Sequence, residues 1–361
     1  GMNMTWEALA GFSLLGFLSI LLPVIPVART LRRMPLKPPP KETAFLPQSQ
    51  CETFRHLVLR QFGHLLSVAR TRGTIQGKTE NGRPYIVLGT NNHLASEIPP
   101  DIRRLKDLII AAGHLDIPGE FICEREIFAE GKINIGHNTM IRSALSPRDI
   151  AINTRARVTR WVRSDRRIDV AESAWVKGWA NAGIEISLAR RARFEHLSAP
   201  LISFGRHAET TLPAKEVIGR YTPPSSQDGD AKCVRTLSVP DLHVAKGNLI
   251  ATETLAIGSE CRVIGDLRAG NNLTIGPHSI IEGAIYSDGN IVIQEACRIT
   301  GPIVARGCIL IHANTRIGTA EHPTTLVAPR VRIAEGCMAH GTVQATQHGD
   351  VFFEDPGKTA D

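Results

Sequence analysis

The sequence predicts an all-β solenoid, a single-stranded β-helix whose coils repeat every 18 residues. A heptad with glycine at its third position carries the repeat and begins at Ala245, Val263, Ile281 and Ile299. An apolar pair follows each heptad, four and six residues after its end: Leu255/Ile257, Leu273/Ile275, Ile291/Ile293 and Ile309/Ile311. Apolar residues two positions apart point to the same side of an extended strand. Each period therefore predicts three short strands around an aliphatic interior.

A weaker form of the same repeat precedes this stretch. Its heptads begin at Leu105, Cys123, Ile141, Val158, Val176 and Phe194, which are 18, 18, 17, 18 and 18 residues apart. Most of these heptads lack the glycine, but apolar pairs fall between them at the expected offset. We therefore expect the solenoid to begin near residue 99 and to contain about 10–11 coils.

Two interruptions and the terminal segments define the remaining organisation. Residues 206–236 break the register with a polar, turn-rich stretch, which we interpret as a protruding loop with room for up to one further coil. A shorter insertion around residues 320–325 delays the next heptad, at Ala339. The predicted segments are a transmembrane anchor (1–30), a Pro-rich linker (31–50), an amphipathic helix and strand cap (51–98), the N-terminal half of the solenoid (99–205), the loop (206–236), the C-terminal half (237–346) and a tail that closes the far end (347–361).

Residues 8–28 are 21 consecutive residues without a charged side chain. As a helix they would span about 31 Å, the thickness of the hydrocarbon core of a bilayer. Five basic residues follow between Arg29 and Lys41. Because positive charge is retained on the cytoplasmic side, we expect a single-pass anchor with the solenoid in the cytoplasm. A signal peptide and a buried soluble helix are the alternatives.

Apolar residues recur at helical spacing between Phe54 and Ala69, which predicts an amphipathic helix. One interpretation is a cap over the open end of the solenoid, because the terminal coil must be covered. The other is a helix that lies on a membrane or binds a partner. The second interpretation depends on four basic residues in the segment: Arg55, Arg60, Arg70 and Arg72.

One column of the repeat holds the glycines Gly178, Gly247, Gly265, Gly283, Gly301 and Gly341. Glycine fits a corner where the backbone needs a positive φ or where coils crowd together. The glycines have no GxGxxG or GxxxxGK[ST] context of a phosphate-binding loop. We therefore interpret the column as structural.

Composition limits the partners and the compartment. The formal net charge of +7 and the isoelectric point near 9.2 indicate attraction to anionic partners, without selecting among membrane, polysaccharide and nucleic acid. The seven cysteines form no CxxC pair and no disulfide framework. Cys261, Cys297 and Cys337 share one inward column, and we expect buried thiols in a reducing compartment.

Arginines are concentrated in the N-terminal coils, close to Trp161, Trp175 and Trp179. Such a surface could bind an anionic polymer or lipid headgroups, or it could only keep the protein soluble. No nucleic-acid recognition code is visible, so no nucleic acid is expected as a partner. The candidate binding face consists of Arg157, Arg160, Arg163, Arg166, Arg167 and Arg193.

No Ser-His-Asp order, carboxylate pair or nucleophilic cysteine indicates catalysis, and no cofactor is expected. His322 lies in the 320–325 insertion. If the chain is an acyltransferase, His322 is the one candidate for its general base. The alternative interpretation is a solvated loop residue. No preformed metal site is expected, because the histidines of the C-terminal half occupy different positions in their coils: His243, His278, His312, His322 and His340.

The stretch GDLRAGNNLTIGPHSIIEGAIYSDGNIVIQEACRITGPIVA, from Gly265 to Ala305, resembles the bactofilins, bacterial polymer-forming cytoskeletal proteins. The resemblance is good over residues 239–317 and weaker over 99–205. It implies a right-handed, triangular β-helix that assembles end to end without nucleotide and is often membrane-associated. On this basis we expect a self-assembling scaffold for cell shape or envelope organisation at the bacterial inner membrane, with partners among envelope-synthesis proteins.

Two other functions remain open. Left-handed hexapeptide acyltransferases share the six-residue strand spacing, and their [LIV]-G-x-x-[STAV] unit occurs at residues 275–279 and 135–139, without continuing over consecutive hexads. An accessory protein that binds an anionic envelope polysaccharide through the arginine face is the other alternative.

Overall fold

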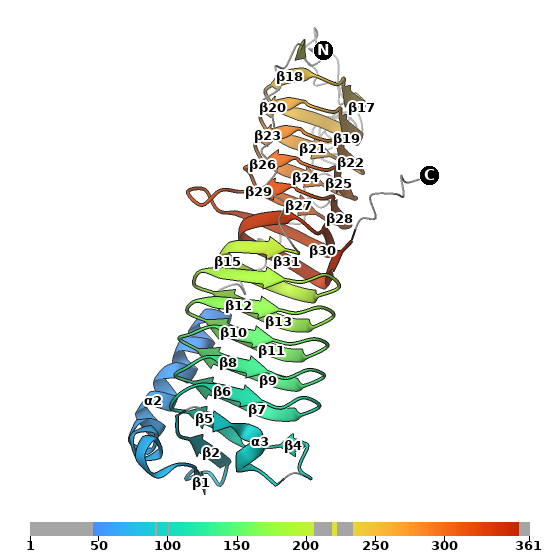
Figure 1. The fold of residues 1–361 in the computed structure, drawn as a ribbon. Coiled ribbons are helices and arrows are strands. Elements are labelled where there is room, and N and C mark those ends of the chain that lie inside the picture. The colour runs from blue at the N-terminus through green and yellow to red at the C-terminus, as the bar shows by residue number, and fades with distance from the viewer. Residues whose placement is uncertain (1–45, 91, 100, 206–218, 222–233, 354–361) are drawn as a thin grey trace, which may run out of the picture. The chain divides into compact units, whose positions relative to one another are not determined.

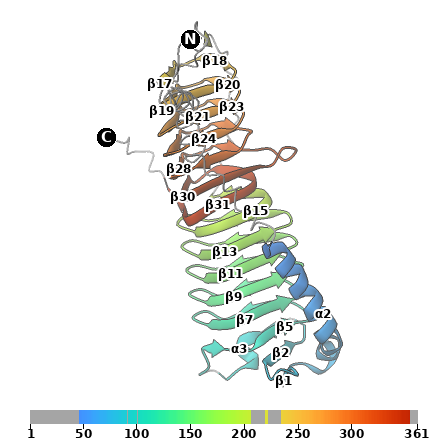
Figure 2. The same cartoon turned by 180° about the vertical axis from the view of Figure 1, so that it is seen from behind.

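The computed structural model of the protein describes residues 46–90, 92–99, 101–205, 219–221 and 234–353. The chain divides into two compact units, Gly1–Gln50 and Cys51–Asp361, and the second contains the solenoid (Figures 1 and 2). The expected transmembrane segment, residues 8–28, lies outside the described residues. Within the described part, no helix is long and apolar enough to span a bilayer.

The predicted all-β solenoid with a period of about 18 residues is confirmed, and it has about 12 coils. The coils begin earlier than expected, because β2 (Pro84–Leu88) pairs in parallel with β5 (Leu108–Ala111) and β3 (Asn92–His93) with β6 (Leu115–Ile117). The segment 51–98 therefore contributes to the first coil. The other strands of the N-terminal half are β4 (Arg104–Leu105), β7 (Ile122–Ala129), β8 (Ile133–Ile135), β9 (Met140–Ser146), β10 (Ile150–Ile152), β11 (Arg157–Ser164), β12 (Arg167–Val170), β13 (Trp175–Ala182), β14 (Glu185–Leu188) and β15 (Arg193–Phe204).

The C-terminal half repeats the same three-stranded coil more regularly. Its first strands are β16 (Gly219–Tyr221), β17 (Val234–Val239), β18 (His243–Lys246), β19 (Leu249–Ile257), β20 (Arg262–Ile264), β21 (Leu267–Ala269), β22 (Leu273–Ile275) and β23 (Ile280–Glu282). Its later strands are β24 (Ile285–Ser287), β25 (Ile291–Ile293), β26 (Arg298–Ile299), β27 (Ile303–Ala305), β28 (Cys308–Ile311), β29 (Arg316–Ile317), β30 (Thr324–Ala334) and β31 (Cys337–Phe352). The predicted apolar pairs point inward and belong to one buried cluster that extends from Ile86 to Val351.

The two halves run in opposite directions. β15, the last strand of the N-terminal half, pairs antiparallel with β31, from Arg193 opposite Asp350 to Phe204 opposite Cys337. In Figure 1 the N-terminal half leads to this junction from one end, and the C-terminal half begins at the other end and returns to it. Most of the predicted loop, residues 206–218 and 222–233, lies outside the described residues, while β16 and β17 pair with strands of the C-terminal half. The period fixes the spacing of coils but contains no information on the direction in which they stack.

The junction also changes the role of the residues that follow 346. We expected a tail that closes the far end, but β31 continues to Phe352 and closes the middle of the stack. Phe194 and Phe204 of β15 are fully buried there, with ring centroids 6.1 Å apart. The two stacks approach the junction from opposite ends, and their strands there are antiparallel. Turning a helix upside down reverses the direction of its strands but not its handedness. Both halves therefore have the same handedness.

The predicted amphipathic helix is present as α2 (Leu46–Arg72), but it packs along the side of the N-terminal half and not over its open end (Figures 1 and 2). Its buried side chains include Val58, Phe62 and Leu66. They pack against one outward-facing apolar column of the coils, Val87, Ile110, Phe128 and Leu145, and against Trp161 of a neighbouring column. At the first coil, the short helix α3 (Leu94–Glu97) supplies a fully buried leucine to the main core, and β1 (Ile75–Lys78) forms an antiparallel hairpin with β2.

Each coil also turns one corner through a residue in the left-handed backbone region, which the sequence pattern does not reveal. These residues have φ between 52° and 61° and recur at intervals of 17 or 18 residues within each half. Only Asn138 and Asn314 are of a type that adopts this conformation readily. The full set is Glu120, Asn138, Arg155, Ser173, Arg191, Leu242, Glu260, His278, Ala296 and Asn314.

The inward column of cysteines contains hydrogen-bond donors, which small size alone does not explain. Cys261 Sγ donates to the carbonyl of Pro240 at 3.0 Å, and Ser279 Oγ donates to that of Gly258 at 3.0 Å. Cys297 Sγ continues the series at 3.2 Å from the carbonyl of Gly276, and burial raises the pKa of its thiol to about 12. None of the six described cysteines forms a disulfide, so these thiols are structural.

The glycine column lies where consecutive coils approach most closely. A Cβ on Gly265, Gly283 or Gly301 would collide with the carbonyl oxygen of the glycine one coil earlier. Gly247 is the first of these glycines in the C-terminal half. A Cβ on Gly247 would meet no atom within 4 Å, but its φ of 100° favours glycine. Collisions with a backbone oxygen also occur at the other members, Gly178 and Gly341.

Gly283→Ala is therefore expected to lower the free energy of unfolding by about 2 kcal/mol or more, because two stacked backbones must separate. Gly63→Ala is the matched control, since a Cβ on Gly63 in α2 meets no atom within 4 Å. Alanine in that helix should raise stability by up to about 1 kcal/mol. Chemical unfolding followed by circular dichroism measures both variants; equal stabilities would show that the column is not sterically required.

Candidate functional site

Part of the predicted arginine face is neutralised by acids in neighbouring coils. Arg166 Nε lies 3.5 Å from a carboxylate oxygen of Asp149, and Arg167 Nε lies 3.6 Å from one of Glu185. Both arginines are exposed, so each pair contributes only about 0–1 kcal/mol to stability. Their effect is to remove net positive charge from this surface.

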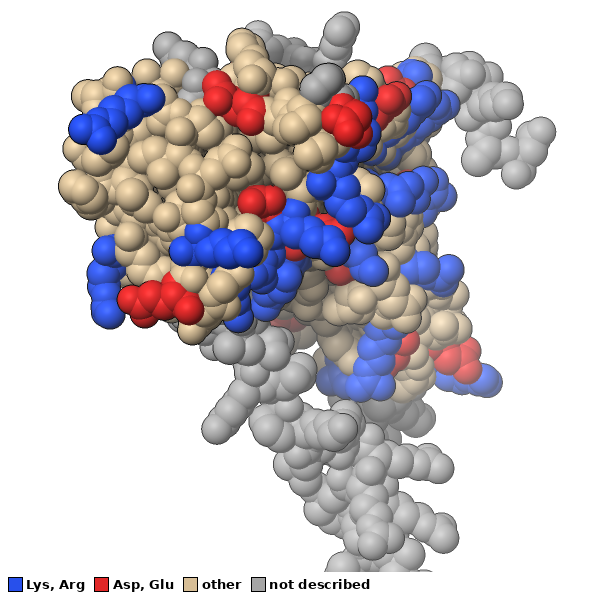
Figure 3. Space-filling view, turned by 90° about the horizontal axis from the view of Figure 1, so that it is seen from below, with Lys and Arg blue, Asp and Glu red and all other residues tan. Residues whose placement is uncertain are grey.

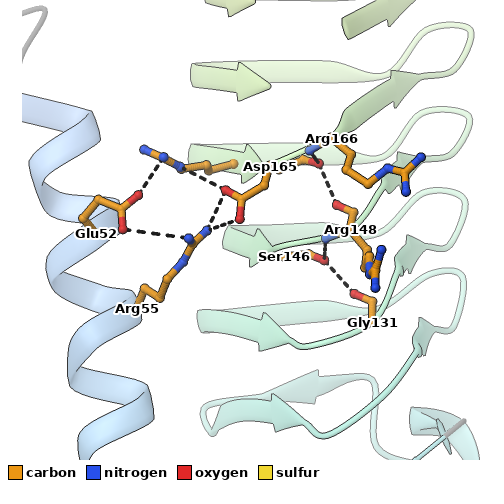
Figure 4. Close-up of polar contacts among 9 residues, drawn as sticks. Glu52, Arg55, Gly131, Ser146, Arg148, Asp165 and Arg166 are labelled. Atoms are coloured by element: carbon orange, nitrogen blue, oxygen red, sulfur yellow. Dashed lines mark hydrogen bonds and ion pairs between the residues drawn. The ribbon is translucent and has the colours of Figure 1, made fainter. Parts of the chain in front are cut away.

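Arg163 belongs to the contact between the solenoid and helix α2, next to Glu52, Arg55 and Asp165, which Figure 4 shows. Its Nη2 lies 2.6 Å from Oε1 of Glu52 on α2, and its side chain is only 16% exposed. Arg55 reaches from α2 in the other direction, and its Nη2 donates to both carboxylate oxygens of Asp165, at 2.7 and 2.9 Å. These crossed pairs join α2 to the end of β11, so Arg163 is not available to a ligand.

Three cations surround one tryptophan on the same half. Arg157 and Arg193 flank Trp175 in one column, one coil before it and one coil after it. Their guanidinium carbons lie 5.8 and 6.0 Å from the indole ring centroid, and Lys177 Nζ lies 5.9 Å from it. No described carboxylate lies within ion-pair distance of the three cations. We call Arg157, Trp175, Lys177 and Arg193 the Trp175 cluster.

Two titratable groups lie beside the Trp175 cluster. Burial raises the pKa of the Glu195 carboxyl, and this outweighs the opposing effect of Lys177 and His348. His196 stacks on Trp179 with ring centroids 4.1 Å apart, and burial lowers its pKa, so the imidazole is neutral at pH 7. The cluster therefore presents three cations around a partly exposed indole, which suits an anionic ligand with a flat or apolar face.

The structure brings only part of the predicted face together. Arg157 and Arg193 meet at Trp175, and Lys177, which the sequence argument did not include, joins them. Arg160 is exposed on β11 but makes no contact with the Trp175 ring within the cation–π distance of the other three. The signal that separates these residues is the 18-residue spacing itself: Arg167 has Glu185 one coil later, whereas Arg157 has Trp175.

His322 lies in an exposed turn between β29 and β30, in the insertion where the sequence placed it. The turn is held by main-chain groups: Thr319 N donates to the carbonyl of His322 at 3.0 Å, and His322 N donates to Thr319 Oγ1 at 3.0 Å. None of the described carboxylates forms an ion pair with this imidazole. Across the described ranges, no group of three or more His, Cys, Asp or Glu side chains could hold a metal ion.

Comparison of the chain with protein-family models, with curated proteins and with solved structures gives no match in any of the three.

The crossed ion pairs predict that α2 depends on Arg55. Arg55→Ala is expected to lower the free energy of unfolding by about 2 kcal/mol, because the partly buried Asp165 loses a bidentate, charge-assisted partner. Arg60→Ala is the matched control, since Arg60 lies on the same helix and pairs with no described carboxylate. Chemical unfolding measures both, and limited proteolysis within α2 should accelerate only for Arg55→Ala. Equal stability of the two variants would contradict the assignment.

Proposed function

We propose that the protein is a non-enzymatic structural scaffold, anchored to the bacterial inner membrane through residues 8–28 with its solenoid on the cytoplasmic side. The observation that carries this proposal is the β15–β31 junction. Two half-solenoids join into one stack with a single buried cluster, which gives a long and stiff element with lateral surfaces for partners. The resemblance of residues 239–317 to bactofilins supports the same role.

Self-assembly of this scaffold would use the first coils of the two halves. The last coil of each half cannot accept a second copy, because the backbone hydrogen-bonding groups of β15 and β31 already pair with one another at the junction. On the N-terminal half, β1, α3 and the buried Leu94 lie at the first coil. On the C-terminal half, β17 is the first strand of its ladder among the described residues, and it pairs with β19. A second copy that adds a strand to β17 would extend that ladder.

This assembly is testable with a charge placed on the edge strand. Ser238 is exposed on β17, and Ala256 and Thr274 follow it in the same outward column. Ser238→Lys is expected to abolish end-to-end assembly, because a lysine on an edge strand opposes strand addition. Thr274→Lys is the matched control two coils away and should assemble normally.

Electron microscopy and light scattering of the full chain in detergent give the readout. Ordered end-to-end assemblies of the unaltered chain and of Thr274→Lys, and monomers of Ser238→Lys, are the expected result. Monomers in all three cases would refute self-assembly. Assembly that Ser238→Lys leaves intact would exclude β17 as the contact.

A second candidate function, binding of an anionic envelope polysaccharide, is favoured by the Trp175 cluster. The partly exposed indole of Trp175 can contact a sugar ring while Arg157, Lys177 and Arg193 neutralise uronic acid carboxylates. Trp175→Ala and Arg193→Gln are each expected to weaken binding of polygalacturonate about tenfold, and added salt should weaken it further. Arg298→Gln, an exposed arginine of the C-terminal half, is the control. Calorimetry that finds no binding, or equal losses in all variants, would exclude the cluster as a polysaccharide site.

A further inference from the structure

A groove on the N-terminal half combines an apolar floor with positive charge. It lies between helix α2, the β1–β2 hairpin and the neighbouring strands, and its volume is about 770 Å³. Phe62 and Tyr85 pack edge to face in it, with ring centroids 5.0 Å apart. The apolar lining consists of Phe54, Leu57, Phe62, Leu65, Tyr85 and Leu108.

The charges that line the groove do not balance. Four cations, Arg60, Lys78, Arg83 and Arg125, face two carboxylates. One of these carboxylates, that of Glu126, already accepts an ion pair from Arg142 at 3.4 Å. Each of the four cations lacks an ion pair to any described carboxylate. The groove therefore selects for a ligand that carries negative charge.

Helix α2 adds exposed apolar surface beside the groove. Leu57 is 44% exposed and lies on the side of α2 that lines the groove. Figure 3, which views the molecule from this end, shows basic and acidic side chains around an area without charged residues. An apolar surface with a basic rim is typical of segments that lie on an anionic membrane.

We propose that this groove binds an anionic phospholipid of the membrane surface, with the lipid phosphate among Arg60, Lys78, Arg83 and Arg125 and the acyl region against the apolar floor. Leu57 enters the bilayer at its margin. The inference rests on the proposed anchoring through residues 8–28, because that anchor brings α2 to the membrane through a linker of fixed length. The linker itself does not suit the groove, since residues 29–45 carry five basic residues and one acidic residue.

The test uses the full chain in vesicles that contain a trace of phosphatidylglycerol with a photoactivatable acyl chain. Peptides from α2 and from the β1–β2 hairpin should be labelled and then identified by mass spectrometry. Arg60→Gln combined with Arg83→Gln is expected to reduce this labelling about tenfold or more, because two phosphate partners are lost. Arg298→Gln combined with Arg316→Gln is the matched control; it removes two exposed arginines from the C-terminal half and should leave the labelling unchanged.

The outcomes separate the groove from the anchor. Chain that floats with vesicles but is labelled only near residues 8–28 would retain the anchor and refute the groove. Chain that does not float with vesicles of any composition would refute the anchor. Equal labelling of the groove by photoactivatable phosphatidylcholine would refute the preference for an anionic lipid. An unlabelled groove that binds a soluble acidic peptide would assign it to a protein partner and overturn the proposal.

Discussion

The backbone hydrogen bonds between stacked coils are the constraint on which the rest of this structure depends. Each coil presents N–H and C=O groups toward the coil before it and the coil after it, so a terminal coil has an open edge that must be covered. This chain covers two such edges with one another, because β15 and β31 form an antiparallel ladder. The contact depends mainly on the backbone, which is why it tolerates the register shifts near Phe194 and Ala199.

Close stacking also determines which side chains each position accepts. The glycine column is needed because a Cβ would meet a carbonyl one coil away, and the inward thiol and hydroxyl groups are needed because they reach carbonyls at a corner. Since the interior is filled in this way, any ligand must bind on a lateral face or in a groove outside the stack. The Trp175 cluster and the groove beside α2 are both of this kind, and both carry cations without a described acidic partner.

The sequence predicts the coil, its period and its inward residues well, because apolar residues two positions apart must point to the same side of an extended strand. It predicted less about elements that depend on contacts distant in sequence. Helix α2 was assigned to the open end, because nothing in the repeat indicated that Ile110 and Phe128 form an outward apolar column. Arginines such as Arg163 were assigned to a binding face, although an acid on α2, Glu52, neutralises it. The reversal of direction left no trace in the periodicity.

A distance across the junction tests this account most directly. Ser198 and Thr342 are register partners in β15 and β31, and both are partly exposed, so each can carry a spin label after conversion to cysteine. Double electron–electron resonance should give a separation of less than about 20 Å, because antiparallel partners are about 5 Å apart at Cα and each label adds several ångströms. One continuous progression of coils would place the two residues about 30 Å apart, at about 4.8 Å per coil. That longer distance would contradict the account.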